Sequence, residues 1–306
     1  MRLVRFLVPA DDTSAAGATP RVGAQRDDGV VDLAAAGVDA SMTDLLAIAS
    51  AAATDAEAAA RWKDVVGAVA AAATVDQDVR LVAPVDPPNY LAIGLNYRAH
   101  VAEGGRPDPE RPVVFNKQIS SVIGPGEAIH VPAAAPDLVD YEGELAVVIG
   151  RRCRRVPKER AYEVIGGYTV ANDVSVRDWQ RASPTMTMGK SWDTHGPIGP
   201  WIVTPDEVAD PQSLRLSTIV DGEVRQDATT AEMIFDIPTL IEHLSTAFTL
   251  LPGTVIATGT PEGVGVYREP RAMLQPGQTV QVVVEGVGTL ENPVIAEPDA
   301  DEVEIG

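Results

Sequence analysis

The stretch Asp140-Tyr141-Glu142-Gly143-Glu144-Leu145 runs directly into the apolar segment Ala146-Val147-Val148-Ile149. The apolar segment predicts a buried strand, and residues two apart on a strand point to the same face. Glu142 and Glu144 are therefore expected to lie side by side. Two carboxylates in that arrangement repel each other unless a positive charge lies between them.

Asp173 follows a second apolar run, at residues 164–171, and is a candidate for a third carboxylate in the same place. Three oxygen ligands without Cys or His suit Mg²⁺ or Mn²⁺ better than Zn²⁺. The alternative is a pair of glutamates facing solvent on an edge strand. The buried character of the run after Glu144 argues against that alternative.

The composition excludes several classes of function. The chain has 306 residues and a formal net charge of −20, and such an acidic protein is unsuited to nucleic acid or anionic membranes, which both attract cationic surfaces. No signal peptide and no apolar run of membrane-spanning length are found. We therefore expect a soluble, cytoplasmic protein.

Cys153 is the single cysteine and lies among four arginines. One cysteine cannot form an internal disulfide, which favours a reducing compartment. Neighbouring cations can lower the pKa of a thiol and make it reactive. The more ordinary interpretation is an incidental residue that follows a strand.

The patterns predict an α+β protein of two domains. Residues 1–80 form a small N-terminal α/β domain with short strands at 3–8, 19–24 and 30–33 and helices at 45–51 and 56–73. Ser41 or Thr43 is expected to cap the first of these helices. Residues 81–306 form the larger domain, which is rich in strands. Its helices are expected at 97–103, 156–165 and 233–248, without a regular βαβ rhythm.

His100 and Glu103 are three residues apart, so on a helical turn they are neighbours. A carboxylate held against an imidazole fixes its tautomer, which suits a general base acting on water. Glycines before and after this segment would let it move as a lid. The alternative is an ordinary exposed pair on a helix.

Arg177 and Gln180 follow Asp173 at spacings of four and seven residues. If residues 173–180 form a helical turn, the metal ligand, a cation and an amide share one face. Arg177 and Gln180 would then hold a substrate carboxylate or oxyanion. The alternative is a surface pair between Asp173 and Arg177, of little energetic value.

Lys190 is a lone lysine in a loop flanked by glycine and aromatic residues. A fixed cation there would stabilise negative charge that develops on an enolate beside the metal. Lys117 is a second candidate of the same kind, expected to contact substrate. A solvated surface lysine is the alternative for both.

Taken in order along the chain, these motifs resemble the fumarylacetoacetate hydrolase family. The matching pieces, which begin near Asn89, are Gly94-Leu95-Asn96-Tyr97 with His100 and Glu103, Phe115-Asn116-Lys117, Asp140-Tyr141-Glu142-Gly143-Glu144-Leu145-Ala146, Asn172-Asp173 with Arg177-Asp178-Trp179-Gln180, Gly189-Lys190-Ser191 with Asp193 and Gly196-Pro197, Thr258-Gly259-Thr260-Pro261, and Gly286-Val287-Gly288-Thr289-Leu290.

The resemblance implies a catalytic domain with a mixed β-roll, a homodimer and one Mg²⁺ or Mn²⁺. It assigns Glu142, Glu144 and Asp173 as metal ligands and the pair His100 and Glu103 as the dyad that activates water. It places Lys190, Arg177 and Gln180 at the substrate oxygens and Thr260 in a loop that lines the site.

One position separates this chain from eukaryotic fumarylacetoacetases. Those enzymes carry an additional acidic ligand ahead of the catalytic histidine, whereas this chain has Asn96 in that region. The resemblance is therefore to the bacterial branch that handles 2-oxo acids, which includes acylpyruvate hydrolases and 2-hydroxyhepta-2,4-diene-1,7-dioate isomerases.

The expected reaction is hydrolysis of a C–C bond in a β-diketo acid of the acylpyruvate type, through a metal-bound enolate. Decarboxylation of oxaloacetate and isomerisation of a 2-hydroxyhepta-2,4-diene-1,7-dioate pass through similar intermediates, so they remain alternatives. A different class of function is a catalytically silent, metal-binding interaction module. Retention of the dyad and of Lys190 argues against the silent module.

Overall fold

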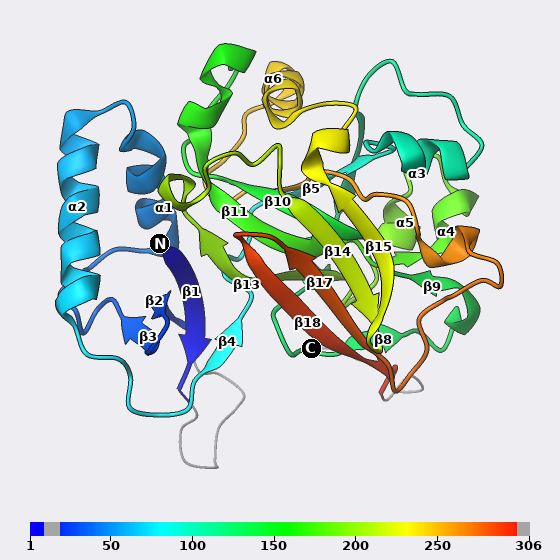
Figure 1. Cartoon of the computed structure of the whole chain (residues 1–306), viewed down its shortest axis with the longest axis horizontal. Coiled ribbons are helices and arrows are strands. Elements are labelled where there is room, and N and C mark those ends of the chain that lie inside the picture. Colours follow the sequence, from blue (N-terminus) through cyan, green and yellow to red (C-terminus); the bar gives the residue numbers. More distant parts are fainter. Residues whose placement is uncertain (9–18, 299–306) are drawn as a thin grey trace, which may run out of the picture.

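The structure is a computed structural model that describes residues 1–8 and 19–298. Strands and helices are interspersed along the chain and build an α+β fold on three sheets (Figure 1). This is the fold class that the sequence predicts.

The largest sheet in the described residues has eleven strands. They are β1 (Arg2–Leu7), β2 (Arg21–Arg26), β3 (Gly29–Asp32), β4 (Arg80–Val82), β5 (Tyr90–Gly94), β6 (Val113–Lys117), β7 (Val122–Ile123), β10 (Gly143–Ile149), β11 (Ile165–Asn172), β13 (Gly196–Val203) and β16 (Val255–Ala257). Their order is β3-β2-β1-β13-β11-β10-β16-β5-β6, with β4 beside β1 and β7 beside β13. Strands β10 and β11 thus lie near the middle of the sheet.

Two smaller sheets accompany it. The five-stranded sheet has the order β15-β14-β17-β18-β8, and β12 pairs with β9. These strands are β8 (Ile129–Val131), β9 (Val139–Asp140), β12 (Ser175–Val176), β14 (Arg215–Val220), β15 (Glu223–Thr229), β17 (Thr279–Val284) and β18 (Gly288–Ala296). In Figure 1 the long strands of the five-stranded sheet lie across the central strands of the large sheet.

The helices lie around the sheets. The α-helices are α1 (Met42–Ala51), α2 (Ala56–Ala71), α3 (Arg98–Glu103), α4 (Arg177–Ala182), α5 (Thr187–Lys190) and α6 (Ile237–Ala247). The 3₁₀-helices are η1 (Ile119–Ser121), η2 (Pro136–Leu138), η3 (Lys158–Val164), η4 (Pro205–Glu207), η5 (Thr230–Glu232) and η6 (Gly265–Tyr267). Figure 1 shows α1 and α2 beside the N-terminal strands and α3, α4 and α5 gathered at the opposite end.

Strand β10 is buried along its whole length because both of its faces are covered. Leu145, Val147 and Ile149 pack in one core with residues of the five-stranded sheet and α6. Ala146 and Val148 alternate with them and pack in a second core with residues of α1 and α2. A strand covered on both faces reads as a continuous apolar run, which explains the sequence pattern.

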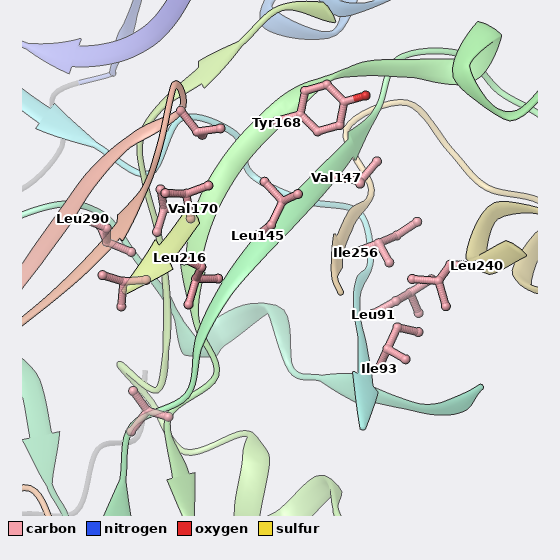
Figure 2. Packing of buried hydrophobic residues seen from close by; sticks show 14 of the residues in the cluster. Leu91, Ile93, Leu145, Val147, Tyr168, Val170, Leu216, Leu240, Ile256 and Leu290 are labelled. Atoms are coloured by element: carbon pink, nitrogen blue, oxygen red, sulfur yellow. The ribbon is translucent and has the colours of Figure 1, made fainter. Parts of the chain in front are cut away.

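The first of these cores contains the largest group of buried apolar side chains. Figure 2 shows it around β10 and β11, with side chains from the five-stranded sheet and from β5, β16 and α6, including Leu91, Ile93, Leu145, Val147, Tyr168, Val170, Leu216, Leu240, Ile256 and Leu290. Burial of this kind stabilises the fold by roughly 25 cal/mol per Å² of apolar surface.

Gly143 separates the two glutamates and faces the five-stranded sheet. A Cβ atom at this position would lie 2.1 Å from Thr218 Oγ1 and 2.9 Å from Val282 Cγ1. A side chain there would require Thr218 on β14 and Val282 on β17 to shift. The alternation along β10 then sends Glu142 and Glu144 to the other face, as the sequence predicts.

The N-terminal strands β1, β2 and β3 continue the large sheet, because β1 pairs antiparallel with β13 through Leu3 and Ile202. Ser41 caps α1 and forms a capping box with Asp44, which confirms one of the two predicted caps. The division of the chain near residue 80 stays a prediction. Within residues 1–8 and 19–298, no helix has the length and apolar character to cross a membrane.

Three local predictions differ from the structure. The helix predicted at residues 156–165 is the shorter 3₁₀-helix η3, Lys158–Val164. Helices α4 and α5 have six and four residues, too short to show a helical period in the sequence. Burial raises the pKa of the half-buried Cys153 thiol to about 11, the opposite of the lowering that a reactive thiol requires.

The close approach at Gly143 predicts a specific sensitivity. We expect Gly143→Ala to lower the free energy of unfolding by about 1–3 kcal/mol, because the added methyl overpacks the contact with the five-stranded sheet. Chemical denaturation monitored by circular dichroism measures this change.

Gly67 is the matched control, because it lies in α2 and a Cβ atom added there would have no neighbouring atom within 4 Å. Gly67→Ala should raise stability by roughly 0.5–1 kcal/mol through helix propensity alone. Equal effects of the two substitutions would contradict the proposed packing at Gly143.

Candidate active site

A cavity of about 430 Å³ opens between α3, α4, α5 and the loop that contains η6. Predicted site residues that line it are His100, Glu142, Arg177, Gln180, Lys190 and Thr260. Glu103 lies beside His100, and Lys117, Glu144 and Asp173 lie behind the cavity wall among buried groups. The structure therefore brings residues from distant parts of the chain to one place.

The pairing of β10 with β11 assembles the three carboxylates. Gly143 lies opposite Asn172 in this pairing. Asp173, which follows β11, therefore lies beside Glu142, which precedes β10. The Asp173 amide donates to the Glu142 carbonyl at 2.8 Å. One carboxylate oxygen from each of Glu142, Glu144 and Asp173 lies within 4.8 Å of the others.

Buried cations neutralise these carboxylates. Lys190 Nζ lies 2.7 Å from Glu142 Oε2 and 2.6 Å from Asp173 Oδ2, so it bridges two predicted ligands. Arg177 Nη1 lies 2.5 Å from Glu142 Oε1. Lys117 Nζ lies 2.6 Å from Asp173 Oδ1. The positive charge that the sequence requires beside the carboxylates is present.

Glu144 differs from its neighbours, because its carboxylate accepts from the Gly259 amide at 2.7 Å and forms no ion pair within the described residues. Burial, followed by the charges of Asp173 and Glu142, raises the pKa of Glu144 well above its usual range. Burial would also raise the pKa of Glu142, but Lys190 and Arg177 outweigh it and hold that pKa well below its usual range.

The charge balance fits a divalent cation. With Glu144 protonated, the three carboxylates of Asp140, Glu142 and Asp173 match the three cations Lys117, Arg177 and Lys190. A bound Mg²⁺ or Mn²⁺ would favour the ionised form of Glu144. An oxygen-only donor set suits these hard cations, so the residues present fit the predicted metal.

Asp140 is a site residue that sequence reasoning did not assign, although it opens the decisive stretch. Its carboxylate is fully buried and accepts from the Gly265 amide at 2.7 Å, the Val266 amide at 3.0 Å and Arg177 Nε at 2.8 Å. Asp140 thus ties the loop at the cavity wall to Arg177. The only feature of the sequence that could have indicated this role is the position of Asp140 just before the Glu142-Gly143-Glu144 motif.

The His100 segment is docked against this same loop. His100 Nδ1 lies 2.7 Å from Glu103 Oε1, and Glu103 Oε2 accepts from the Gly263 amide at 3.0 Å. Because a carboxylate only accepts, Nδ1 carries the proton in the neutral imidazole, which leaves Nε2 as an acceptor. Tyr267 packs near the imidazole, with ring centroids 6.2 Å apart. The pair is therefore partly buried at the cavity instead of exposed on a helix.

Arg177 and Gln180 lie on α4, and Arg177 Nη1 donates to Gln180 Oε1 at 3.0 Å. The expectation that Asp173 shares this helical face is wrong, because α4 begins at Arg177. Asp173 precedes the short strand β12, whose pairing with β9 keeps the chain extended there. Asp173 contacts Lys117 and Lys190 instead of Arg177.

Lys190 ends α5, and a close helix contact positions it. A Cβ atom at Gly189 would lie 2.1 Å from the backbone nitrogen of Gln180. Only glycine lets α5 approach α4 this closely, and the next residue then points its ammonium group between Glu142 and Asp173.

Lys117 and Thr260 both form hydrogen bonds to groups around the triad, but only Thr260 lines the cavity, as predicted. Lys117 donates to Asp173 and to the carbonyls of Val174 and Lys190, and it does not line the cavity. Thr260 lines the cavity, but its hydroxyl donates to the Gly143 carbonyl at 3.0 Å. Lys117 therefore supports a ligand, and Thr260 supports the start of β10.

Gln226 and Asn96 are further supporting residues. Gln226 accepts from the Gly143 amide at 2.9 Å and donates to Thr260 Oγ1 at 2.8 Å. Asn96 donates to the Thr258 carbonyl at 2.7 Å and accepts from the Phe235 amide at 2.8 Å. Both amides join loops around the site, and nothing in their local sequence indicates this.

The raised pKa of Glu144 predicts how pH affects the metal-free protein. The folded state holds this proton more tightly than the unfolded chain, so the free energy of unfolding falls as pH rises above about 4.3, the unfolded pKa of Glu, through the raised folded value. Thermal denaturation with chelator, at a series of pH values above about 4.3, should show a loss of up to ~1.4 kcal/mol per pH unit for this proton until the raised folded pKa is passed.

Glu144→Gln should remove this loss, and added Mg²⁺ should reverse it in the wild type. The exposed Glu159→Gln is the control for removal of one charge. The lowered pKa of Lys117 gives a slope of opposite sign in every variant, so the difference between variants is the test. Identical slopes for wild type and Glu144→Gln would contradict the assignment.

Comparison with known proteins agrees with this arrangement. A family model described as "Fumarylacetoacetate (FAA) hydrolase C-terminal" matches residues 89–295. The Mycobacterium tuberculosis protein Rv2993c is 48% identical over 219 residues, which cover 71% of this chain and 79% of that protein.

Two solved enzymes have the same fold over almost the whole chain. Fumarylacetoacetate hydrolase from psychrophilic Exiguobacterium antarcticum is 34% identical with a TM-score of 0.80, covering 97% of this chain and 100% of that one. The 5-carboxymethyl-2-hydroxymuconate delta-isomerase from Mycobacterium smegmatis is 36% identical with a TM-score of 0.72, at the same coverages. These matches confirm the predicted family: the chain belongs to the fumarylacetoacetate hydrolase family.

Proposed function

We propose that this protein is a divalent-metal-dependent hydrolase that cleaves a C–C bond in a β-diketo acid of the acylpyruvate type. The observation that carries the proposal is the position of the His100–Glu103 pair on the same cavity as Glu142 of the carboxylate triad. A base for water and a site for an oxygen-chelating acid would then share a single cavity.

Glu142, Glu144 and Asp173 would hold Mg²⁺ or Mn²⁺. When bound, the cation supplies Lewis acidity toward the oxygens of the 2-oxo acid group. Glu142 is the ligand that lines the cavity, so the substrate's 2-oxo acid end is expected to lie on that side of the triad.

His100 is the general base of the proposed reaction. Its Nε2 takes a proton from water, and the water oxygen forms a bond to the carbonyl carbon farther from the 2-oxo acid group. The C–C bond on the inner side of that carbon then breaks, and its electron pair passes to the 2-oxo acid fragment as an enolate. Protonation of the enolate carbon releases the 2-oxo acid, and the other fragment leaves as a carboxylic acid.

Arg177 and Lys190 are placed to stabilise the negative charge of the enolate. Lys190 is 1% exposed and lines the cavity, and Asp173 and Glu142 outweigh the effect of burial and raise its pKa. Arg177 Nη2 is buried and has no hydrogen-bond partner within the described residues. A buried donor without a partner is costly, and a substrate oxygen would satisfy it.

Isomerisation of a 2-hydroxy-dienoate is the second candidate, favoured by the similarity to the Mycobacterium smegmatis isomerase. It needs proton transfer along the substrate but no bond cleavage, and His100 could serve both reactions. Oxaloacetate decarboxylation and a silent metal-binding module remain less favoured, because neither requires a base beside a water-accessible cavity.

The homodimer and the cytoplasmic location remain proposals that follow from the family resemblance and the composition. Sedimentation equilibrium would test the dimer, and a mass equal to one chain at micromolar concentration would count against it.

Release of pyruvate from acetylpyruvate is the direct test of hydrolysis. We expect Mg²⁺- or Mn²⁺-dependent turnover that a chelator abolishes. His100→Ala should lower kcat by roughly 10²–10⁴-fold, because it removes the general base. A coupled lactate dehydrogenase assay measures the product.

His243→Ala is the matched control, since His243 lies on α6 away from the cavity lining. Retained activity in His100→Ala, or no turnover by protein shown to bind metal, would count against hydrolysis. In the second case, a change in dienoate absorbance without pyruvate release would favour isomerisation.

A further inference from the structure

The carboxylate of Asp140 holds parts of the active site that it does not share with a ligand. Asp140 is fully buried and lies outside the cavity lining. The amides of Tyr141, Gly265 and Val266 and Nε of Arg177 all donate to its two oxygens. A carboxylate has about four acceptor sites, so this one is fully used by its neighbours. Its contribution to the site is therefore made through the groups that it holds.

The first of these groups is the Arg177 guanidinium. Asp140 Oδ2 accepts from Nε at 2.8 Å, while Glu142 Oε1 and Gln180 Oε1 accept from Nη1 at 2.5 and 3.0 Å. The N–H donors of a guanidinium form a rigid, planar fork, so these contacts fix the orientation of the whole group. Asp140 therefore helps to set the direction of Nη2, the donor that we assign to a substrate oxygen.

The second group is the loop at residues 263–267, which reaches the cavity at Val266. The Gly265 amide donates to Asp140 Oδ1 at 2.7 Å, and the Val266 amide donates to Oδ2 at 3.0 Å. A Cβ atom at Gly265 would lie 2.6 Å from Asp140 Oδ1 and 2.4 Å from the Ala272 carbonyl oxygen. Glycine thus allows the loop to approach the carboxylate this closely.

Tyr141 holds the same loop at its other end. Its buried side chain ends in a hydroxyl that donates to the Gly263 carbonyl at 2.9 Å. Gly263 has a φ of +97°, and a Cβ atom there would lie 2.2 Å from the Arg225 carbonyl oxygen on β15. The loop is therefore held close to β15 at Gly263, and two consecutive residues, Asp140 and Tyr141, hold both of its ends.

The dyad is docked on this loop. Glu103 Oε2 accepts from the Gly263 amide at 3.0 Å, and Glu103 Oε1 pairs with His100 Nδ1 at 2.7 Å. Tyr267, at the end of the loop, packs near the imidazole. Gly263 thus connects Tyr141, through its carbonyl, with Glu103, through its amide.

On the basis of the proposed function, we propose that Asp140 and Tyr141 are positioning residues that couple the two halves of the reaction. They hold Arg177 for the enolate on one side and, through residues 263–267, the His100 imidazole for water on the other. The orientation of His100 then depends on two side chains that it does not contact.

Asp140→Asn tests this coupling because it keeps the shape of the side chain and replaces one acceptor by a donor. In one orientation the new amino group faces the Gly265 amide, and in the other it faces the Val266 amide and Arg177 Nε. At least one amide of the loop therefore loses its acceptor in either orientation.

Proton NMR of protein that contains isotope-labelled histidine follows the dyad without relying on the reaction. The proton on His100 Nδ1 is protected by Glu103, and its signal is assigned by its absence from His100→Ala. In Mg²⁺-loaded protein without substrate, Asp140→Asn should speed exchange of this proton with water by roughly 10–100-fold. The ring N–H of His195, which donates to the His130 carbonyl at 2.8 Å, should exchange unchanged in the same spectrum.

Asp32→Asn is the matched control. Asp32 is also a buried carboxylate that accepts from a backbone amide, that of Ala34 at 3.0 Å, and pairs with an arginine, Arg21. It lies on β3, outside the cavity lining. Unchanged exchange at His100 in folded Asp140→Asn overturns the proposal. Equal acceleration in Asp32→Asn also overturns it, since it would indicate general loosening of the protein.

Tyr141→Phe tests the loop separately and gives an answer even if Asp140→Asn does not fold. It removes only the hydroxyl that holds Gly263 and leaves the contact between Asp140 and Arg177 in place. Exchange at His100 should rise in this variant too. Unchanged exchange would overturn the link through the loop.

Kinetics with acetylpyruvate separate this inference from the proposed reaction. Tyr141→Phe should lower kcat by roughly 10–100-fold with little change in KM. It should have no further effect in the His100→Ala background, because it acts through that imidazole. Faster exchange at His100 in variants of a protein that releases no pyruvate supports the positioning role and counts against hydrolysis. Additive effects of the two substitutions, with pyruvate released by the wild type, overturn the positioning role and support hydrolysis.

Discussion

Four carboxylates buried at one junction impose the main constraint on this structure. Asp140, Glu142, Glu144 and Asp173 are at most 5% exposed, and isolated charges in such a place would cost several kcal/mol each. The fold meets this cost with three buried cations from separate elements. Removal of any one partner would leave an unpaired buried charge, a change that typically costs ~3–5 kcal/mol. The network therefore ties together the strands, helices and loops that carry these residues.

The carboxylates of this network are not equally neutralised, and the difference suits the proposed binding of a divalent metal. Three of the carboxylates have cationic partners, whereas Glu144 has an amide partner and a raised pKa. The site is thus close to neutral without a metal and gains an ionised ligand when a divalent cation binds. Lys190 bridges Glu142 and Asp173, so a cation at the triad would compete with it for those oxygens. A released ammonium group would then be available for an enolate.

The sheets explain why the chemistry lies where it does. Glycine between the two glutamates lets the five-stranded sheet pack against β10, and the alternation along the strand sends both carboxylates to the other face. Asp140 then joins the site to the loop that carries Gly265 and Val266. The residues proposed to face substrate come from α3, α4, α5 and that loop, while the proposed ligands lie on β10 or directly beside an end of β10 or β11. In general, a rigid sheet fixes the core of a site, while the loops around it can vary to suit different substrates.

The sequence by itself determined the Glu142 and Glu144 pair, the His100–Glu103 pair, the buried strands and the α+β class, because each depends on residue type at short spacing or on periodicity two. Only the tertiary structure decided what Asp140, Gln226 and Asn96 do and which cation meets which carboxylate. It also placed Lys117 behind the triad and Asp173 outside α4. Those outcomes depend on contacts between residues far apart in the chain, such as Asp140 with Gly265, and no local pattern specifies such contacts.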